Sequence, residues 1–441
     1  MSICGIDIGT TNLKVALFDD ANRMIWIKSV PTPRTEDRFG VATDVRKLVE
    51  VVEDLLIEGW RETGRRGPIL AISTSGVGED GVYVDENFDP VTCSIPWFDL
   101  RAGEEAKLLA HSSAATPSSG IEMEPTRTAA RWLWTSKVLP EITRRAHLWL
   151  SLTDYPLANW ARAAFFADTL ASRTGCFNSG IREWIGPLLR ESHAPELPPV
   201  VRAGTVIGTM KNERLCASGA VDTNTLLVAG GHDHPVAAHA IHGLAADARV
   251  DSLGTANVIY GDAPRFEIDV FDPQIAFTAS IEGPEKVACL GVFEFTKAVN
   301  QFPGGVEAIR REMALAKISG MPGNPAGRQF NSERQLLEWA TFNARFMLDR
   351  LAQYGVPEGP VYATGGWSRS RALLELRASV LGREIYVPDE RELSVLGAAL
   401  FAAEATGRMT AFETPVSVVE PDRSWTAAYE DFYGEFLAQR S

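Results

Sequence analysis

Two short apolar segments separated by a polar turn open the chain. Residues 3–8 and 13–18 are almost entirely apolar, and Gly9-Thr10-Thr11-Asn12 stands between them. Apolar runs of this length around a Gly/Asn turn predict a β-hairpin. Because the first run lacks the alternation of a half-exposed strand, we expect it to be a central strand buried on both faces.

An acidic residue, Asp7, interrupts the first run just before the turn. A buried carboxylate is costly unless it is paired or faces a cation. The turn offers backbone N–H groups and two hydroxyls, which can form a cradle for an anion. A carboxylate beside such a cradle favours Mg²⁺ with a nucleotide phosphate, although a hairpin with a structural aspartate fits the same residues. The chain has no Gly-x-x-x-x-Gly-Lys-Ser/Thr sequence, so the turn is not a Walker A loop.

The same pattern returns in the second half of the chain. Residues 250–260 contain Gly254-Thr255-Ala256-Asn257, again after an apolar strand with an aspartate and before an apolar strand. Self-similarity at this distance predicts two related halves.

Periodicity predicts the other main elements. Apolar residues at helical spacing between 45 and 60 predict a helix, and the runs before and after it predict strands at 24–30 and 69–74. The same reasoning predicts a strand at 361–364 and three late helices, at 370–381, 393–404 and 426–439.

The composition of the chain limits the kinds of partner and compartment that the protein can have. A length of 441 residues suits two or three domains, and a net charge of −14 disfavours nucleic acid and anionic membranes as partners. The five cysteines lie far apart without a Cys-x-x-Cys, which is typical of reduced thiols, so we expect a cytoplasmic protein. We find no signal peptide at the N-terminus and no apolar run long enough to span a membrane.

A glycine-rich strand end precedes an acidic residue at the start of a helix. Residues 226–242 run from an apolar strand through Gly230-Gly231 to Asp233, and a helix is expected to begin near Pro235. Four of the seven histidines lie here: His232, His234, His239 and His242. The spacing of His232 and His234 would allow chelation of zinc, but no acid or thiol cluster completes a tetrahedral ligand set in the sequence.

A second polar loop follows the strand at 69–74. It begins with Ser75-Gly76, continues through Gly78 and Glu79, and is followed by an apolar strand and Trp97-x-Asp99-x-Arg101. An aromatic platform and charged groups are what a sugar-binding site needs. The alternatives are a core aromatic for Trp97 and a surface ion pair for Asp99 and Arg101.

In their order and spacing, these motifs resemble the FGGY family of carbohydrate kinases, within the actin/hexokinase/Hsp70-like superfamily. The resemblance covers nearly the whole chain. It implies an α/β fold of two actin-like (ribonuclease H-like) domains, with mixed sheets flanked by helices and a ligand cleft between them. We place the boundary between residues 241 and 242, so that 1–241 carries the sugar site and 242–441 the adenosine-binding block.

The resemblance also implies roles for residues. Asp233 matches the catalytic base, and Asp7 with Asp233 would hold Mg²⁺. The nucleotide ATP would be held by both hairpins and by glycine-rich segments, that is by Gly9, Thr10, Thr11, Asn12, Gly254, Thr255, Gly304, Gly305, Gly365, Gly366 and Ser370. The sugar would be held by Gly76, Glu79, Trp97, Asp99, Arg101, His232 and Asp233.

The family's Arg-Glu or Met-His pair after the Ser-Gly strand reads Gly78-Glu79 here. We expect this glycine to open the pocket, which favours phosphorylation of a ketose or linear polyol, a pentulose such as xylulose before others. A glycerol-type polyol kinase, a non-enzymatic nucleotide switch and a sugar-binding regulator remain as alternatives. The partner is then a small-molecule sugar or polyol, and a homodimer is an open alternative to a monomer.

Overall fold

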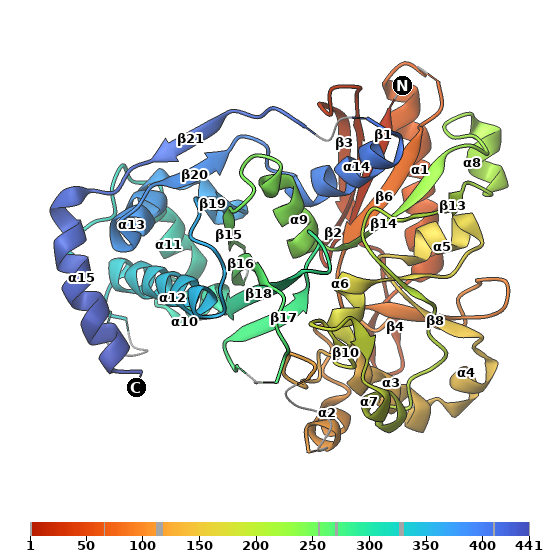
Figure 1. The fold of residues 1–441 in the computed structure, drawn as a ribbon, viewed down its shortest axis with the longest axis horizontal. Helices are drawn as coiled ribbons and strands as arrows, with labels where there is room; N and C mark the ends of the chain where they lie inside the picture. Colours follow the sequence, from red (N-terminus) through yellow and green to blue (C-terminus); the bar gives the residue numbers. More distant parts are fainter. Residues whose placement is uncertain are drawn as a thin grey trace.

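The computed structural model describes residues 2–65, 67–111, 118–254, 256–269, 272–325, 330–408 and 411–440. Over these residues the chain forms two large mixed sheets, which lie side by side in Figure 1. The first sheet has the order β13 (Val206–Thr209), β14 (Leu226–His232), β6 (Ala71–Gly76), β1 (Ile3–Ile8), β2 (Asn12–Phe18), β3 (Met24–Pro31). The second has the order β17 (Ile275–Ala279), β18 (Lys286–Phe293), β16 (Asn257–Pro264), β15 (Arg249–Leu253), β19 (Val361–Thr364), β20 (Ile385–Pro388), β21 (Val416–Val419).

The two sheets share one topology. In the first, β1 pairs antiparallel with β2 and parallel with β6; in the second, β15 pairs antiparallel with β16 and parallel with β19. Each hairpin predicted from the sequence therefore occupies the same place in its sheet. The expectation of two actin-like domains with mixed sheets is confirmed.

Smaller strand pairs and helices surround the first sheet. The pairs are β4 (Arg34–Asp37) with β5 (Gly40–Thr43), β7 (Gly81–Val84) with β8 (Leu148–Ser151), β9 (Phe166–Ala167) with β12 (Val200–Val201), and β10 (Phe177–Asn178) with β11 (Glu183–Trp184). The helices are α1 (Val45–Glu62), α2 (Gly103–Ala110), α3 (Thr128–Val138), α4 (Pro140–Arg145), α5 (Tyr155–Ala161), α6 (Asp168–Ala171), the 3₁₀ helix η1 (Ser172–Thr174), α7 (Gly186–Glu191), α8 (Glu213–Ser218) and α9 (Asp233–His242).

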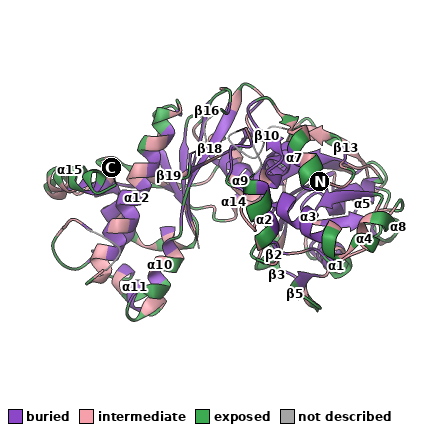
Figure 2. Cartoon of the chain, turned by 90° about the horizontal axis from the view of Figure 1, so that it is seen from below, coloured by how far each residue is buried: buried purple, intermediate pink, exposed green. Residues whose placement is uncertain are grey.

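The remaining helices belong to the second half of the sequence. They are α10 (Phe295–Gln301), α11 (Gly305–Met313), α12 (Glu333–Gln353), the 3₁₀ helix η2 (Gly366–Arg369), α13 (Arg371–Leu381), α14 (Leu393–Ala405) and α15 (Arg423–Ala438). Strands and inward helix faces hold most of the buried residues, as Figure 2 shows.

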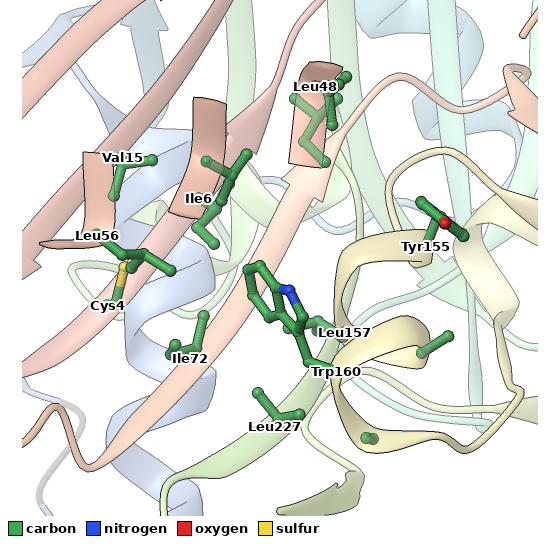
Figure 3. Close-up of a cluster of buried hydrophobic side chains, with 14 of the residues drawn as sticks. Cys4, Ile6, Val15, Leu48, Leu56, Ile72, Tyr155, Leu157, Trp160 and Leu227 are labelled. Atoms are coloured by element: carbon green, nitrogen blue, oxygen red, sulfur yellow. The ribbon is translucent and has the colours of Figure 1, made fainter. Parts of the chain in front are cut away.

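The first core joins β1 to α1 and α5. Every residue of β1 is buried, as expected for a central strand paired on both sides. Asp44 caps α1 by accepting a hydrogen bond from Lys47 N, and Leu48 and Leu56 of that helix pack with Ile6 and Trp160 (Figure 3). This packing fixes the end of β1, where Asp7 lies.

Helix α14 belongs to the second half by sequence but packs on the first sheet. It contacts β1, β6 and α9, and Figure 1 shows it crossing to those strands. Its small residues allow close approach: a Cβ at Gly397 would lie 2.0 Å from Val236 O of α9, and one at Gly5 of β1 would lie 2.1 Å from Val395 O. The sequence-based boundary at 241/242 stays a prediction.

Candidate active site

A cavity of about 500 Å³ lies between the two halves. From the first half it is lined by Thr10, Glu79, Trp97, His232 and Asp233, among others, and from the second half by residues of β16, β17 and β18. The predicted ligand cleft is therefore present, and it gathers residues from four separate motifs.

Asp233 is the first residue of α9, at the end of β14. Its Oδ1 accepts a hydrogen bond from His234 N at 2.7 Å and lies 3.2 Å from His232 Nε2. In the described part of the chain nothing donates a hydrogen bond to Oδ2, and the side chain is 35% exposed. One carboxylate oxygen is thus held, the other has no donor among the described residues, and Asp233 lines the cleft.

His232 supports Asp233 as a neutral ring. Burial lowers the pKa of His232 to about 4, so the imidazole carries one proton at neutral pH. The contact with Asp233 assigns that proton to Nε2, and the buried Nδ1 has no hydrogen-bond partner among the described residues. His232 can therefore orient the carboxylate without adding a charge.

Asp7 is buried near the end of β1, beside the first hairpin turn. Burial, with the nearby charge of Asp233, raises the pKa of Asp7 to about 7, although Lys14 at 4.0 Å and a hydrogen bond from Ser394 (3.0 Å) oppose the shift. Its Oδ1 has no hydrogen-bond partner within the described ranges. Two carboxylates that affect each other electrostatically, one with an orphaned oxygen, fit a hard divalent cation that also holds phosphates.

Asp7→Asn should raise stability and lower activity. A carboxyl pKa raised in the folded state gives stability that is complete below its unfolded value of 3.8 and lost as pH rises through about 7. The shift of about three pKa units corresponds to at most about 4 kcal/mol. We therefore expect the Tm gain of Asp7→Asn over the wild type to be larger at pH 8 than at pH 5, by calorimetry. The exposed Asp431→Asn serves as control, and an Asp7→Asn protein less stable than the wild type at pH 8 would contradict the burial argument.

Glu79 pairs with two arginines. Burial alone would raise its pKa, but Arg173 and Arg127 outweigh burial and hold the pKa of Glu79 at about 2. Arg173 Nε lies 2.9 Å and Arg127 Nη1 3.0 Å from Oε1. Both arginines line the cleft, and neither was predicted from the sequence.

The expectation that Gly78 opens the pocket is wrong. A Cβ at Gly78 would lie 2.6 Å from Cγ of Arg173 and 2.9 Å from Cδ2 of His232. The space that a longer side chain would take is therefore filled by Arg173, which reaches Glu79 from η1.

Trp97 lines the cleft and contacts the first hairpin. Its indole Nε1 donates to Thr10 Oγ1 at 2.8 Å, and its side chain is half-exposed. The core-aromatic alternative is therefore excluded.

Asp99 and Arg101 lie apart from the cleft lining. Arg101 pairs with Asp99 at 2.7 Å and with Asp37 of β4 at 2.8 Å. The two side chains do form an ion pair, but they are largely buried and not at the surface, and neither residue is among those that line the cleft. Their role in sugar binding stays a prediction.

Gly76 is buried against its neighbours rather than exposed to a ligand. A Cβ there would lie 2.5 Å from Ile8 O and 2.7 Å from Thr153 Oγ1. The glycine lets β6 pack closely against the end of β1. Its effect on the site is therefore indirect.

The first hairpin is a tight turn. Gly9 N donates to Asn12 O at 3.0 Å, and a Cβ at Gly9 would lie 2.7 Å from the same oxygen. Thr11 and Asn12 are exposed, and Thr10 alone of the four lines the cleft. In the second hairpin Gly254 is described, whereas Thr255 lies outside the described residues.

A larger cavity of about 730 Å³ lies in the second half. It brings together three of the predicted nucleotide residues, Gly254, Gly366 and Ser370. Its lining also contains Trp367, for which the sequence leaves adenine stacking and space filling open. Thr296, Arg310 and Arg369 line it as well, and the sequence did not predict them as ligands. The two arginines give this cavity a positive wall suited to phosphates.

Other glycines that were predicted to bind the nucleotide have positive φ angles. Gly304 has φ 81° at the start of α11, Gly305 has φ 52°, and Gly365 has φ 86°. A Cβ at Gly365 would lie 2.6 Å from Leu253 O, so this glycine lets the chain pass β15. The Ser370 hydroxyl caps α13 and donates to Met313 O.

The histidines of α9 form no metal centre in the described chain. His239 and His242 contact Glu282 at 3.3 and 3.0 Å, and the described residues contain no group of three or more potential ligands that could hold a metal ion. Among the described helices none is long and apolar enough to cross a membrane.

Comparison with known proteins agrees with this geometry. Residues 2–240 match the model for the N-terminal domain of the FGGY family of carbohydrate kinases, and residues 300–406 match the model for its C-terminal domain. The chain is 26% identical to a xylulose kinase of Streptomyces rubiginosus, over 97% of this chain and 91% of that protein. It is 22% identical to a gluconokinase of Bacillus subtilis (strain 168), over 93% and 88%.

Solved structures share the fold. The structure of a "xyloylose kinase" from Brucella ovis superposes with a TM-score of 0.85 at 20% identity, over 100% of this chain and 98% of that one. Plasmodium falciparum glycerol kinase with ADP gives 0.82 at 16% identity, over 99% and 98%. With both family models matched in order, the chain belongs to the FGGY family of carbohydrate kinases, which transfer a phosphoryl group to a hydroxyl of their substrate.

Proposed function

We propose that this kinase uses MgATP to phosphorylate a hydroxyl of a ketose or linear polyol, with a pentulose such as xylulose as the favoured acceptor. The observation that carries the proposal is the convergence of Asp233, Glu79 and Trp97 on one cleft next to the Thr10 hairpin. The xylulose kinase relative, similar over almost the whole chain, supports the choice of acceptor.

Each of these residues has its own role in the proposed reaction. Asp233 takes the proton of the attacking hydroxyl on Oδ2, because His232 and His234 N hold Oδ1. Trp97 offers an apolar wall to the carbon chain, and Glu79 with Arg173 binds hydroxyls. Asp7 and Asp233 would hold Mg²⁺, directly or through water, and MgATP supplies the phosphoryl group and neutralises its charge. Thr10 and Gly254 would bind the phosphates, and the 730 Å³ cavity would take the nucleoside.

One observation favours a glycerol-type polyol kinase as the second candidate. Arg173 places a guanidinium beside Glu79 and so rebuilds, from another element, the Arg-Glu pair that the sequence loop lacks. A small triol would then suit the filled pocket better than the open pocket expected from Gly78.

The acceptor can be identified by ADP release over a panel of ketopentoses, pentitols, gluconate and glycerol at equal concentrations. The proposal expects the highest kcat/KM for a ketopentose or pentitol. A preference for glycerol would establish the second candidate, and a sugar that binds by calorimetry without ADP release would show a non-catalytic sugar-binding regulator. ATP binding with no sugar bound or phosphorylated would point to a nucleotide switch.

Trp97→Phe should lower kcat more than it raises KM. The Thr10 hydroxyl accepts from the indole N–H, so its own proton is free to be donated to a phosphate oxygen. Phenylalanine keeps the apolar wall but loses the donor, and a hydrogen bond of ordinary strength predicts a kcat loss of about 2- to 10-fold. Trp97→Ala, which loses wall and donor together, should raise the KM for the sugar as well. If kcat and KM of both variants equal those of the wild type, the hydrogen bond from Trp97 to Thr10 has no catalytic role.

A further inference from the structure

Helix α9 connects the two halves of the molecule. It lies between the two large sheets in Figure 1, and it contacts β14 and β6 of the first sheet and β16 of the second. Asp233, its first residue, lines the cleft, whereas His242, its last residue, does not. The catalytic proposal gives His242 no role.

His242 is buried against acceptor groups of the second half. Its side chain is 5% exposed, and its Nδ1 lies 3.0 Å from Glu282 Oε1 in the turn between β17 and β18. Asp262 Oδ2 of β16 lies 3.8 Å from the same nitrogen. On the other side of the ring, Nε2 lies 3.1 Å from the backbone oxygen of Ala248.

These contacts determine the protonation state of the His242 ring. A backbone carbonyl only accepts, so Nε2 carries a proton towards Ala248. Burial opposes ionisation of Glu282, but hydrogen bonds from His239 and His242 hold the pKa of Glu282 well below its usual range, so this carboxylate also only accepts. Nδ1 must therefore carry a proton as well, which makes His242 an imidazolium. Burial would lower the pKa of His242, but the bond with Glu282 raises it.

The second histidine of this cluster needs no charge. His239 Nδ1 lies 3.3 Å from the same Glu282 oxygen, and its ring stacks on Phe401 of α14 at 4.3 Å. A single proton on Nδ1 satisfies this contact, so His239 can donate as a neutral ring. His242 is thus the residue of the pair whose charge the geometry requires.

The other titratable groups beside His242 do not replace this charge. Tyr260 donates its hydroxyl to Asp262 Oδ1 at 3.0 Å, and burial raises the pKa of Tyr260. Burial also raises the pKa of the Cys289 thiol, so both groups are neutral. Burial raises the pKa of Asp262 too, and His242 opposes that shift. His242 is therefore the cation that balances the acidic groups of this junction.

The turn that carries Glu282 is also held from another part of the first half. Arg182 Nη2 donates to Ser280 O at 2.7 Å and to Gly283 O at 2.8 Å. The turn is thus a contact between the two halves, and its bond with His242 ties the C-terminal end of α9 into that contact.

We propose that His242 is a positioning residue, which as an imidazolium bound to Glu282 fixes α9 against the second half and so sets the place of Asp233 relative to the nucleotide. The inference rests on the proposed role of Asp233 as the base. A cation at the last position of a helix also interacts favourably with the helix dipole. Phosphoryl transfer is catalysed largely by positioning, so a small displacement of the base lowers the rate.

The charge of His242 can be measured by NMR of protein labelled with ¹⁵N in its histidine rings, with the signal assigned from His242→Gln. We expect a titration midpoint above 6.5 in the wild type and a lower one in Glu282→Gln, whose amide can donate to a neutral Nδ1. Glu285→Gln, at an exposed position of the same turn, is the matched control and should leave the midpoint unchanged. A wild-type midpoint at or below 6.5, or an unchanged midpoint in Glu282→Gln, would overturn the proposal.

Stability and its pH dependence test the same charge without reference to catalysis. A histidine pKa raised in the folded state gives stability that is complete below the unfolded value of 6.5 and lost as pH rises through the folded-state pKa. The urea midpoint of His242→Gln should therefore fall further below that of the wild type at pH 6 than at pH 9. An equal deficit at both pH values would show that the charge of His242 stabilises nothing.

The positioning role is tested by the pH profile of kcat. Wild-type kcat should fall on the alkaline side with the midpoint of the His242 titration, and Glu282→Gln should lack that fall because its bond with His242 needs no charge. At pH 6.5, His242→Gln should lower kcat about 10-fold, as one charge-assisted hydrogen bond predicts, and leave KM for sugar and ATP unchanged, since His242 lines neither cavity. An alkaline fall that persists in Glu282→Gln would refute the positioning role. A wrong assignment of the base would instead be seen in Asp233→Asn, with the NMR and stability results unaffected.

Discussion

Asp233→Asn should lower kcat by about 10²- to 10⁴-fold, the usual loss when a general base is removed. Asparagine keeps the shape and can still accept from His234 N, so the start of α9 should be preserved. The amide cannot take the proton of the attacking hydroxyl. ADP release in a coupled assay measures the loss, and calorimetry should find ATP affinity nearly unchanged.

The control removes a different carboxylate from the same cleft. Glu294 lines it from the second half and is exposed, so Glu294→Gln should retain turnover close to the wild type. If Asp233→Asn instead turned over at the wild-type rate, another group would be the base.

Local sequence signals located the hairpins and the catalytic candidate. The Gly9–Asn12 turn and the Gly230-Gly231 strand end each combine an apolar strand, glycines and a single acidic residue within a few positions. Such features depend on nearest neighbours, and the structure has them where the sequence predicts them. The second hairpin is predicted by the repeat of the same Gly-Thr-x-Asn turn, and the two sheets share the corresponding strand arrangement.

Contacts between distant segments could not be predicted in this way. Arg127 and Arg173 are 48 and 94 positions from Glu79, and nothing in their own neighbourhoods marks them as its partners. The sugar-binding role of Asp99 and Arg101 comes from a local motif and stays a prediction, but the partner that completes their ion-pair cluster, Asp37, belongs to another hairpin and was not predicted. Gly78 was misjudged for the same reason, since the side chain that fills its space comes from η1.

Glu79→Ala should weaken both sugar binding and the fold. Removing one partner of a buried pair leaves Arg127 and Arg173 without their shared carboxylate, and breaking such pairs typically costs about 3–5 kcal/mol. The KM for the sugar should rise strongly, because the hydroxyl acceptor is lost and the released arginines reorient into the cleft. ATP affinity should change little, because the residues that line the nucleotide cavity are untouched.

The pH dependence of stability separates the effect of the Glu79 charge from the effect of its side-chain shape. A carboxyl pKa lowered in the folded state gives stability that is complete above its unfolded value of 4.5 and lost as pH falls towards about 2. The instability of Glu79→Gln relative to the wild type should therefore be full at pH 7 and smaller at pH 4, as measured by the urea midpoint. Glu124→Gln, which removes the more exposed partner of Arg127, should cost far less because solvent screens that pair. Should Glu79→Gln and Glu124→Gln prove equally mild at pH 7, the buried Glu79 charge would not be what holds the two arginines in the sugar cleft.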